Sequence, residues 1–123
     1  MEIIKFRIYN PEEKRMVESG ATPMMLHSFF EYTARFNTQL EMPYQQFTGL
    51  SDSHSKEIYE GDILQVPVQG GEKYEVVFND GGFTVKNIDS KSAMPASNEY
   101  LKVFAKQEEI IGNVYENPDL LKI

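Results

Sequence analysis

The feature that most constrains the fold is a succession of short strand-like segments, separated by turns, that occupies the chain from residue 43 onward. In most of them apolar and polar residues alternate, which is typical of a strand with one buried face. Residues 74–78 and 83–88 form the clearest pair, because Asp80-Gly81-Gly82 between them is a strong hairpin turn in which glycine adopts positive φ at little cost. Short strands at spacings of about 8–12 residues predict a small β-barrel or sandwich.

The remaining strands of this part are expected on the same basis. In chain order they are 44–50, 58–59, 63–68, 100–104 and 109–115. Polar residues 51–56 and 89–98 are expected as loops, and Gly70-Gly71 as a turn. Pro67 has no N–H to donate, so its strand is predicted to lie at a sheet edge or to end there. Residues 119–121 are expected to form one terminal helical turn or an interaction tail.

The first 42 residues predict a β-hairpin followed by one helix. Residues 4–8 alternate apolar and basic side chains, Asn10-Pro11 is turn chemistry, and residues 15–17 return as the second strand. Thr22-Pro23 is a helix start, because Thr caps the first turn and Pro is tolerated in it. Apolar residues then recur at helical spacing; they are Met25, Phe29, Tyr32 and Phe36. We therefore expect a helix over about residues 23–36, with a strand as the alternative because of the aromatic content.

Composition narrows the chemistry that this fold can carry. The 123 residues include no Cys, which excludes disulfides, thiolate catalysis and Cys-ligated metal sites. The length fits one ordinary domain, so we expect residues 1–42 (hairpin and helix) and 43–123 (small barrel) to form one compact unit. The formal net charge is −7, and residues 49–123 hold seven lysines against thirteen acidic side chains. Such an acidic surface makes nucleic acid a disfavoured partner.

The sequence shows neither a secretion signal nor a membrane span. Charged residues interrupt the apolar residues at the N-terminus, starting with Glu2. The uncharged run 21–30 contains Pro23 and falls well short of the roughly 20 apolar residues that cross a bilayer. We expect a cytoplasmic protein with no membrane partner.

Three ordered motifs carry a family resemblance. Residues 44–52 read Tyr-Gln-Gln-Phe-Thr-Gly-Leu-Ser-Asp, and residues 56–63 continue with Lys-Glu-Ile-Tyr-Glu-Gly-Asp-Ile. Residues 111–121 read Ile-Gly-Asn-Val-Tyr-Glu-Asn-Pro-Asp-Leu-Leu, and residues 5–9 at the start match more loosely. Together they resemble the YopX-like family, small proteins found mostly in bacteriophages and prophages. One departure is the loop at residues 51–56, which lacks the glycine that members commonly have there.

The resemblance implies a mainly β fold whose C-terminal part is a small SH3-like barrel. It also implies a homo-oligomer in a bacterial host cell and no enzymatic activity. The motif residues that it marks as structural are Gly49, Leu50, Glu57, Ile58, Tyr59, Gly61, Asp62, Gly112, Asn113, Tyr115, Glu116, Asn117 and Pro118.

Few side chains are candidates for catalysis or metal binding. His27 and His54 are the only histidines. We expect packing for His27 and exposure for His54, and assign no metal because no other soft ligand accompanies either. No nucleophile elbow or phosphate-binding glycine loop is present, so we assign no catalytic residue and no cofactor. The best carboxylate cluster is Glu57, Glu60 and Asp62, which could perform acid–base chemistry. The competing interpretation is structural, because Asp at a turn commonly accepts backbone N–H groups.

The leading hypothesis is a non-enzymatic interaction or assembly module that binds a protein partner or a second copy of the chain. One alternative is a nucleic-acid-binding small barrel, which would use its aromatic residues or Arg7 and the other basic side chains of the first hairpin. The other alternative is an unrecognised hydrolase that uses Glu57, Glu60 and Asp62.

Overall fold

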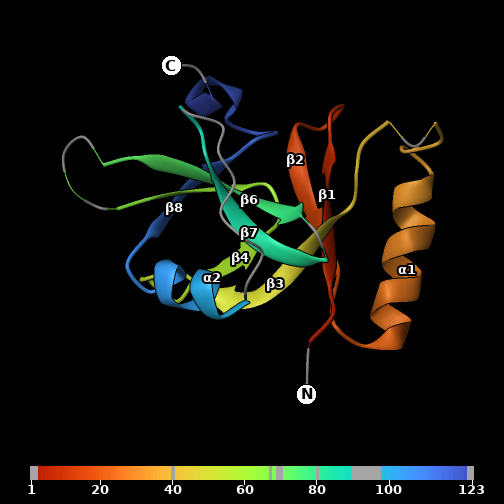
Figure 1. Cartoon of the computed structure of the whole chain (residues 1–123). Helices are drawn as coiled ribbons and strands as arrows, with labels where there is room; N and C mark the ends of the chain where they lie inside the picture. Colours follow the sequence, from red (N-terminus) through yellow and green to blue (C-terminus); the bar gives the residue numbers. More distant parts are fainter. Residues whose placement is uncertain are drawn as a thin grey trace.

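The computed structural model describes residues 3–39, 41–66, 68, 71–79, 81–89 and 98–121. Over these residues the chain is mainly β, with two antiparallel four-stranded sheets, helix α1 (Pro23–Ala34) beside the first and helix α2 (Asn98–Ala105) against the second (Figure 1). The expected mainly β fold, with a hairpin and a helix at its start, is confirmed. The predictions for Pro67, Gly70, Asp80 and residues 90–97 of the expected loop, Pro95 among them, fall outside the described residues.

The first sheet joins the N-terminal hairpin to the middle of the chain. Its strands are β1 (Phe6–Asn10), β2 (Arg15–Glu18), β3 (Gln45–Ser51) and β4 (Glu57–Tyr59), in the order β2-β1-β3-β4. At the hairpin turn the side-chain oxygen of Asn10 accepts two backbone N–H groups, as the turn chemistry predicted. Phe6 of β1 pairs with Gln46 of β3, so hydrogen bonds cross the expected boundary between residues 42 and 43. That boundary stays a prediction.

Helix α1 begins where the sequence predicted and ends slightly earlier. The Oγ1 atom of Thr22 accepts the N–H of Met25 at 3.2 Å. Pro23 occupies the first turn, where a missing N–H does no harm. Phe29 is buried, and its ring packs edge-on against that of Tyr44 with the centroids 5.9 Å apart. The aromatic side chains that suggested a strand instead fasten this helix to the segment before β3.

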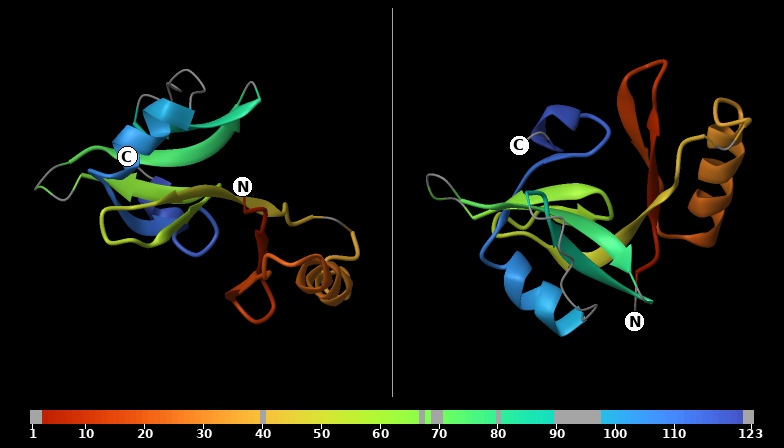
Figure 2. Two further views of the ribbon diagram at one scale, coloured as in Figure 1. Left: turned by 90° about the horizontal axis from the view of Figure 1, so that it is seen from below. Right: turned by 45° about the horizontal axis from the view of Figure 1, so that its top comes forward.

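The second sheet is built from the C-terminal half of the chain. Its strands are β5 (Asp62–Gln65), β6 (Lys73–Asn79), β7 (Gly82–Asn87) and β8 (Glu109–Asn113), in the order β7-β6-β5-β8, and the sheet curls strongly (Figure 2). Gly81 has a φ of +84°, as the predicted β6–β7 turn requires. β8 ends earlier than expected because Asn113 Oδ1 accepts the N–H groups of Tyr115 and Glu116. The chain then forms the 3₁₀ helix η1 (Pro118–Leu121), the expected terminal turn.

One predicted strand, residues 100–104, is wrong: these residues belong to α2. Leu101 and Ala105 are each 1 % exposed, whereas Val103 is 61 % exposed. A strand would place Leu101 and Val103 on the same face, while residues four apart share a face of a helix. Burial of Leu101 together with Ala105, four residues further along, therefore selects the helix.

The main core lies between β4, the second sheet and α2. Its buried residues are Ile58, Leu64, Val76, Val85, Leu101 and Ala105. Full burial of one large aliphatic side chain stabilises by roughly 1.5–3 kcal/mol, so this cluster holds β4 and α2 on the sheet. Closure into an SH3-like barrel stays a prediction. In the described part of the chain, no helix is long and apolar enough to cross a membrane.

Candidate functional site

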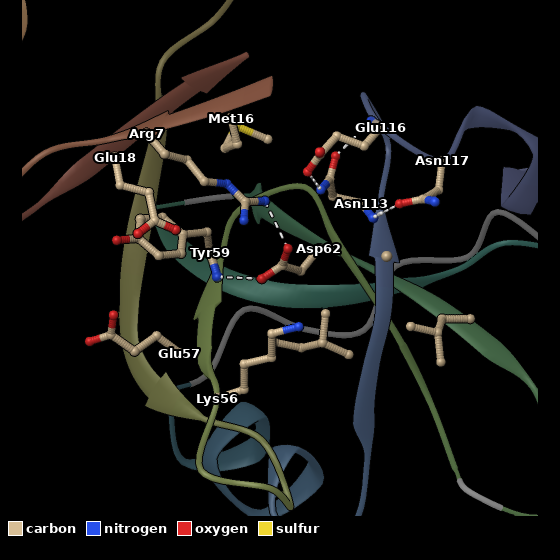
Figure 3. A pocket seen from close by; sticks show the side chains of 13 residues that line it. Arg7, Met16, Glu18, Lys56, Glu57, Tyr59, Asp62, Asn113, Glu116 and Asn117 are labelled. Carbon is tan, nitrogen blue, oxygen red and sulfur yellow. Dashed lines mark hydrogen bonds and ion pairs between the residues drawn. The ribbon is translucent and has the colours of Figure 1, made fainter. Parts of the chain in front are cut away.

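Residues of the middle motif (56–63) and of the closing motif (111–121) meet in one pocket. It has a volume of about 570 Å³ and opens between β4, β8 and the β1–β2 hairpin (Figure 3). The lining residues that the two motifs contribute are Lys56, Glu57, Tyr59, Asp62, Ile111, Gly112, Asn113, Glu116 and Asn117. Arg7, Met16 and Glu18 come from the hairpin. We call this cavity the motif pocket.

A buried ion pair between Arg7 and Asp62 forms the floor of the motif pocket. The distance from Arg7 Nη2 to Asp62 Oδ1 is 2.8 Å, and the two side chains are 7 % and 3 % exposed. Asp62 Oδ2 accepts the N–H of Tyr59, while Arg7 Nε donates to Gln45 Oε1. Burial raises the pKa of Asp62, and the Arg7 guanidinium opposes that rise. Since both partners make further hydrogen bonds, the floor is rigid.

Tyr59 is packed beside this ion pair. Its ring is 2 % exposed, lies under the Arg7 guanidinium at 4.7 Å from the ring centroid, and contacts the Phe47 ring at 5.5 Å between centroids. Burial raises the pKa of the Tyr59 hydroxyl, and the carboxylates of Glu18 and Glu57 raise it further. The phenol therefore stays protonated at neutral pH.

Asn113 organises the opposite wall, where the closing motif turns away from β8. Its Nδ2 donates to Glu116 Oε1 at 2.8 Å, and its backbone N–H donates to Asn117 Oδ1 at 3.2 Å. A Cβ atom at Gly112 would lie 2.5 Å from Asn117 Oδ1, so a larger residue would displace that side chain. The Gly-Asn pair of the motif therefore fixes where Glu116 and Asn117 lie.

The outer edge of β8 is capped by the loop between β3 and β4. Asp52 Oδ2 accepts the N–H of Ile110 at 2.9 Å, and the carbonyl of Glu108 accepts the N–H of Ser53 at 2.9 Å. Ser55 adopts a φ of +62°, so it takes the left-handed conformation that the missing glycine would favour. These two bonds attach the loop to the start of β8.

The other motif residues hold the fold around the pocket. Gly61 has a φ of +90° and its position leaves no room for a Cβ atom, which would lie 2.5 Å from Gln45 Nε2. Gly49 has a φ of +87° with open space around it. Tyr115 stacks on Tyr9 with the centroids 6.2 Å apart. Of the remaining three, Ile58 is in the core, Leu50 packs against it, and Pro118 begins η1.

The carboxylates proposed for a hydrolase do not share one cavity. Glu57 and Asp62 line the motif pocket, whereas Glu60 lines a separate cavity of about 260 Å³. Glu57 is ion-paired with Lys5, and Asp62 with Arg7. Each of the two hydrolase candidates that line the motif pocket therefore already has a cationic partner.

The histidines lie at the surface and apart from this pocket. The expectation of a packing role for His27 is wrong: its side chain is 73 % exposed and pairs with Glu31, one helical turn along α1. His54 is exposed as predicted and pairs with Glu109. Within the residues that the structure describes, no three His, Cys, Asp or Glu side chains lie close enough to hold a metal ion.

Sequence reasoning did not find the role of Arg7. Its position between Phe6 and Ile8 in an alternating strand suggested a surface cation, yet Arg7 is 6 % exposed. The sequence signal for a buried cation was Asp62, because a motif carboxylate that becomes buried needs a cationic partner. Which cation supplies that partner is a long-range contact that spacing along the chain does not reveal.

The fold and the pocket define a small, mainly β protein in which sequence motifs distant along the chain enclose one polar cavity. The sequence model of the family described as YopX protein matches residues 5–122, and the chain belongs to that family. It is also similar to the crystal structure of protein EF1440 from Enterococcus faecalis, with a TM-score of 0.65 and 25 % identity over 99 % of this chain and 100 % of that one. No curated protein matches it.

Proposed function

We propose that this chain is a non-enzymatic interaction module and that the motif pocket is its docking site. The observation that carries the proposal is the convergence of polar residues from the middle and closing motifs on one cavity with a rigid, ion-paired floor. Rigid, partly buried polar groups lower the ordering cost of binding, which suits them to recognition. Membership of the YopX family supports a setting in a bacteriophage or prophage and the cytoplasm of its bacterial host.

The charges around the cavity favour a basic partner. Of its four lining carboxylates, Asp62 and Glu57 are paired with Arg7 and Lys5, whereas Glu18 and Glu116 have no ion pair among the described residues; Lys56 is a further lining cation. The whole chain has a net charge of −7, which speeds the approach of cations and slows that of phosphate backbones. We therefore propose that the partner inserts a Lys or Arg side chain between the carboxylates of Glu18 and Glu116, which lie on opposite walls (Figure 3).

The partner is either a different protein or a second copy of this chain, whose C-terminal part we propose to be an SH3-like barrel. Multi-angle light scattering at tens of micromolar distinguishes the two. A mass of one 14.2 kDa chain removes the homo-oligomer and leaves a different protein as the partner.

Affinity capture from lysate of phage-infected bacteria tests the docking site. The bait is the wild-type chain or the double variant Glu18→Gln and Glu116→Gln, which keeps the side-chain shapes and removes two carboxylates from the motif pocket. We expect quantitative mass spectrometry to find one partner that the wild type retains and the variant loses by at least tenfold, since charge pairs in such sites contribute about 1.4 kcal/mol or more.

The matched control is the double variant Glu12→Gln and Glu41→Gln, which makes the same charge change at exposed positions outside the pocket. It should retain the partner like the wild type. Equal loss in both double variants would assign the effect to net charge, and equal retention in both would refute docking at the motif pocket.

A further inference from the structure

Glu108 is a buried carboxylate outside the motif pocket. Glu108 is 1 % exposed, and neither its Oε1 nor its Oε2 atom has a hydrogen-bond partner among the described residues. Buried polar groups in folded proteins are almost always paired, so an unpaired carboxylate requires a physical explanation.

Two hydrogen bonds of its own backbone hold Glu108 in place. The N–H of Glu108 donates to the carbonyl of Ala105 at the end of α2, and its own carbonyl accepts the N–H of Ser53. Glu108 therefore lies three residues beyond Ala105, close to the C-terminus of α2, where the helix dipole disfavours negative charge. Its side chain lies at the junction that connects α2 to β8.

Among the described residues, the charged groups on the neighbouring elements do not neutralise Glu108. Tyr74 of β6 interacts with it electrostatically, but a phenol carries no positive charge at neutral pH. On the β3–β4 loop, Asp52 is an acid that accepts backbone N–H groups and His54 pairs with Glu109. Lys106 is exposed. Burial raises the pKa of Glu108 from 4.5 to about 7.

We propose that Glu108 is a proton-operated latch: protonated, it closes the junction of α2 and β8, and ionised, it loosens that junction. The physical reason is that a neutral carboxyl group can stay buried without a partner at modest cost, whereas a carboxylate cannot. Opening would uncover the core surface that Leu101 and Ala105 cover, next to Ile58 and Val85. Glu108 does not line the motif pocket, so the latch goes beyond the docking proposed there.

The sign of the pH dependence follows from the raised pKa. In the open form Glu108 ionises near its ordinary value of 4.5, and in the closed form near 7. Opening should therefore become more favourable as pH rises from about 4.5 to 7, and level off above 7. Each pH unit within this window changes the opening equilibrium by up to tenfold.

Amide hydrogen exchange followed by NMR at pH 5 and pH 8 tests the latch, with rates corrected for intrinsic exchange. The protection factors of Leu101 and Ala105 should fall at least tenfold between the two values, while that of Val76 in β6 changes little. In Glu108→Gln the fall should disappear, and in the exposed control Glu12→Gln it should remain.

Protection factors of α2 that do not change with pH, or that fall equally in Glu108→Gln, would overturn the proposal. If the Gln variant does not fold, the carboxyl ¹³C resonance of Glu108 in the wild type decides. A titration midpoint above 6 supports the latch, and a midpoint at or below 5 refutes it.

Discussion

At the scale of single residues, the pair of Arg7 and Asp62 matters most. Both charges are almost fully buried, and together with Gln45 and Tyr59 they form a small polar network inside the protein. Such a pair need not stabilise relative to apolar residues of the same size. Replacing only one of the two residues, however, leaves a buried charge without a partner. The floor of the motif pocket is therefore sensitive to substitution.

Arg7→Met should lower the free energy of unfolding by about 3–5 kcal/mol, because Asp62 then lacks its cation. Adding Asp62→Asn should recover part of that loss, since no charge remains buried. Urea denaturation of the single and double variants measures both effects. Arg15→Met is the control, because Arg15 pairs with Glu13 at the surface. Equal losses in Arg7→Met and Arg15→Met would contradict the account.

Gly49 and Gly61 form a matched pair for testing how much a close neighbouring side chain adds to the cost of replacing a glycine. Both have φ near +90°, but a Cβ atom meets open space at Gly49 and the Gln45 amide at Gly61. Gly49→Ala should therefore cost about 1–2 kcal/mol from backbone strain alone. Gly61→Ala should cost roughly 1–3 kcal/mol more, because Gln45 must move away from Arg7. Chemical denaturation of both variants measures the difference, and a Gly49→Ala loss equal to or larger than that of Gly61→Ala would be inconsistent with the packing described.

At the scale of elements, the β3–β4 loop owes its conformation to one carboxylate. Asp52 accepts the N–H groups of His54, Lys56 and Ile110, so it closes the loop and attaches it to β8. Burial works to raise the pKa of Asp52, but these N–H groups outweigh burial and hold the pKa below its usual 3.8. The stabilisation is therefore present above pH 4 and is lost as pH falls through the lowered pKa.

Asp52→Ala should lower the free energy of unfolding by about 1–3 kcal/mol at neutral pH, because three partly buried N–H groups lose their acceptor. The difference between wild type and variant should shrink as pH falls through the lowered pKa of Asp52, since the wild-type carboxylate then becomes protonated. Thermal unfolding followed by circular dichroism between pH 2 and 7 measures this convergence. A difference that stays constant over the whole range would show that the carboxylate charge is not involved.

The difference between local and long-range contacts explains which elements of the fold the sequence predicts. Turns with their own chemistry, such as Asn10-Pro11 and Thr22-Pro23, were predictable because the interaction is local. The α2 segment was not, because apolar Leu101 and Val103 fit a strand while Leu101 and Ala105 fit a helix. Only packing against the core decides between the two spacings. The motif pocket was beyond prediction for a related reason, since Arg7 and Asp62 meet only through the pairing of distant strands.

At the scale of the whole molecule, the distribution of charge and the position of the motif pocket both favour a basic partner. The acidic excess lies in residues 49–123, which also supply most of the lining of the motif pocket. A protein with this charge distribution attracts basic segments from a distance and offers them one cavity with carboxylates on opposite walls. We therefore propose that the motif pocket binds a cationic side chain.

An NMR titration of the ¹⁵N-labelled chain with N-acetyl-arginine amide tests this claim most directly, with the uncharged citrulline analogue as the control. We predict saturable shifts of the Glu18, Tyr59, Asn113 and Glu116 amides with the arginine compound. With the citrulline compound, or in the double variant Glu18→Gln and Glu116→Gln, the same shifts should be at least tenfold weaker. Equal shifts with both compounds, or shifts confined to residues outside the pocket, would contradict the account.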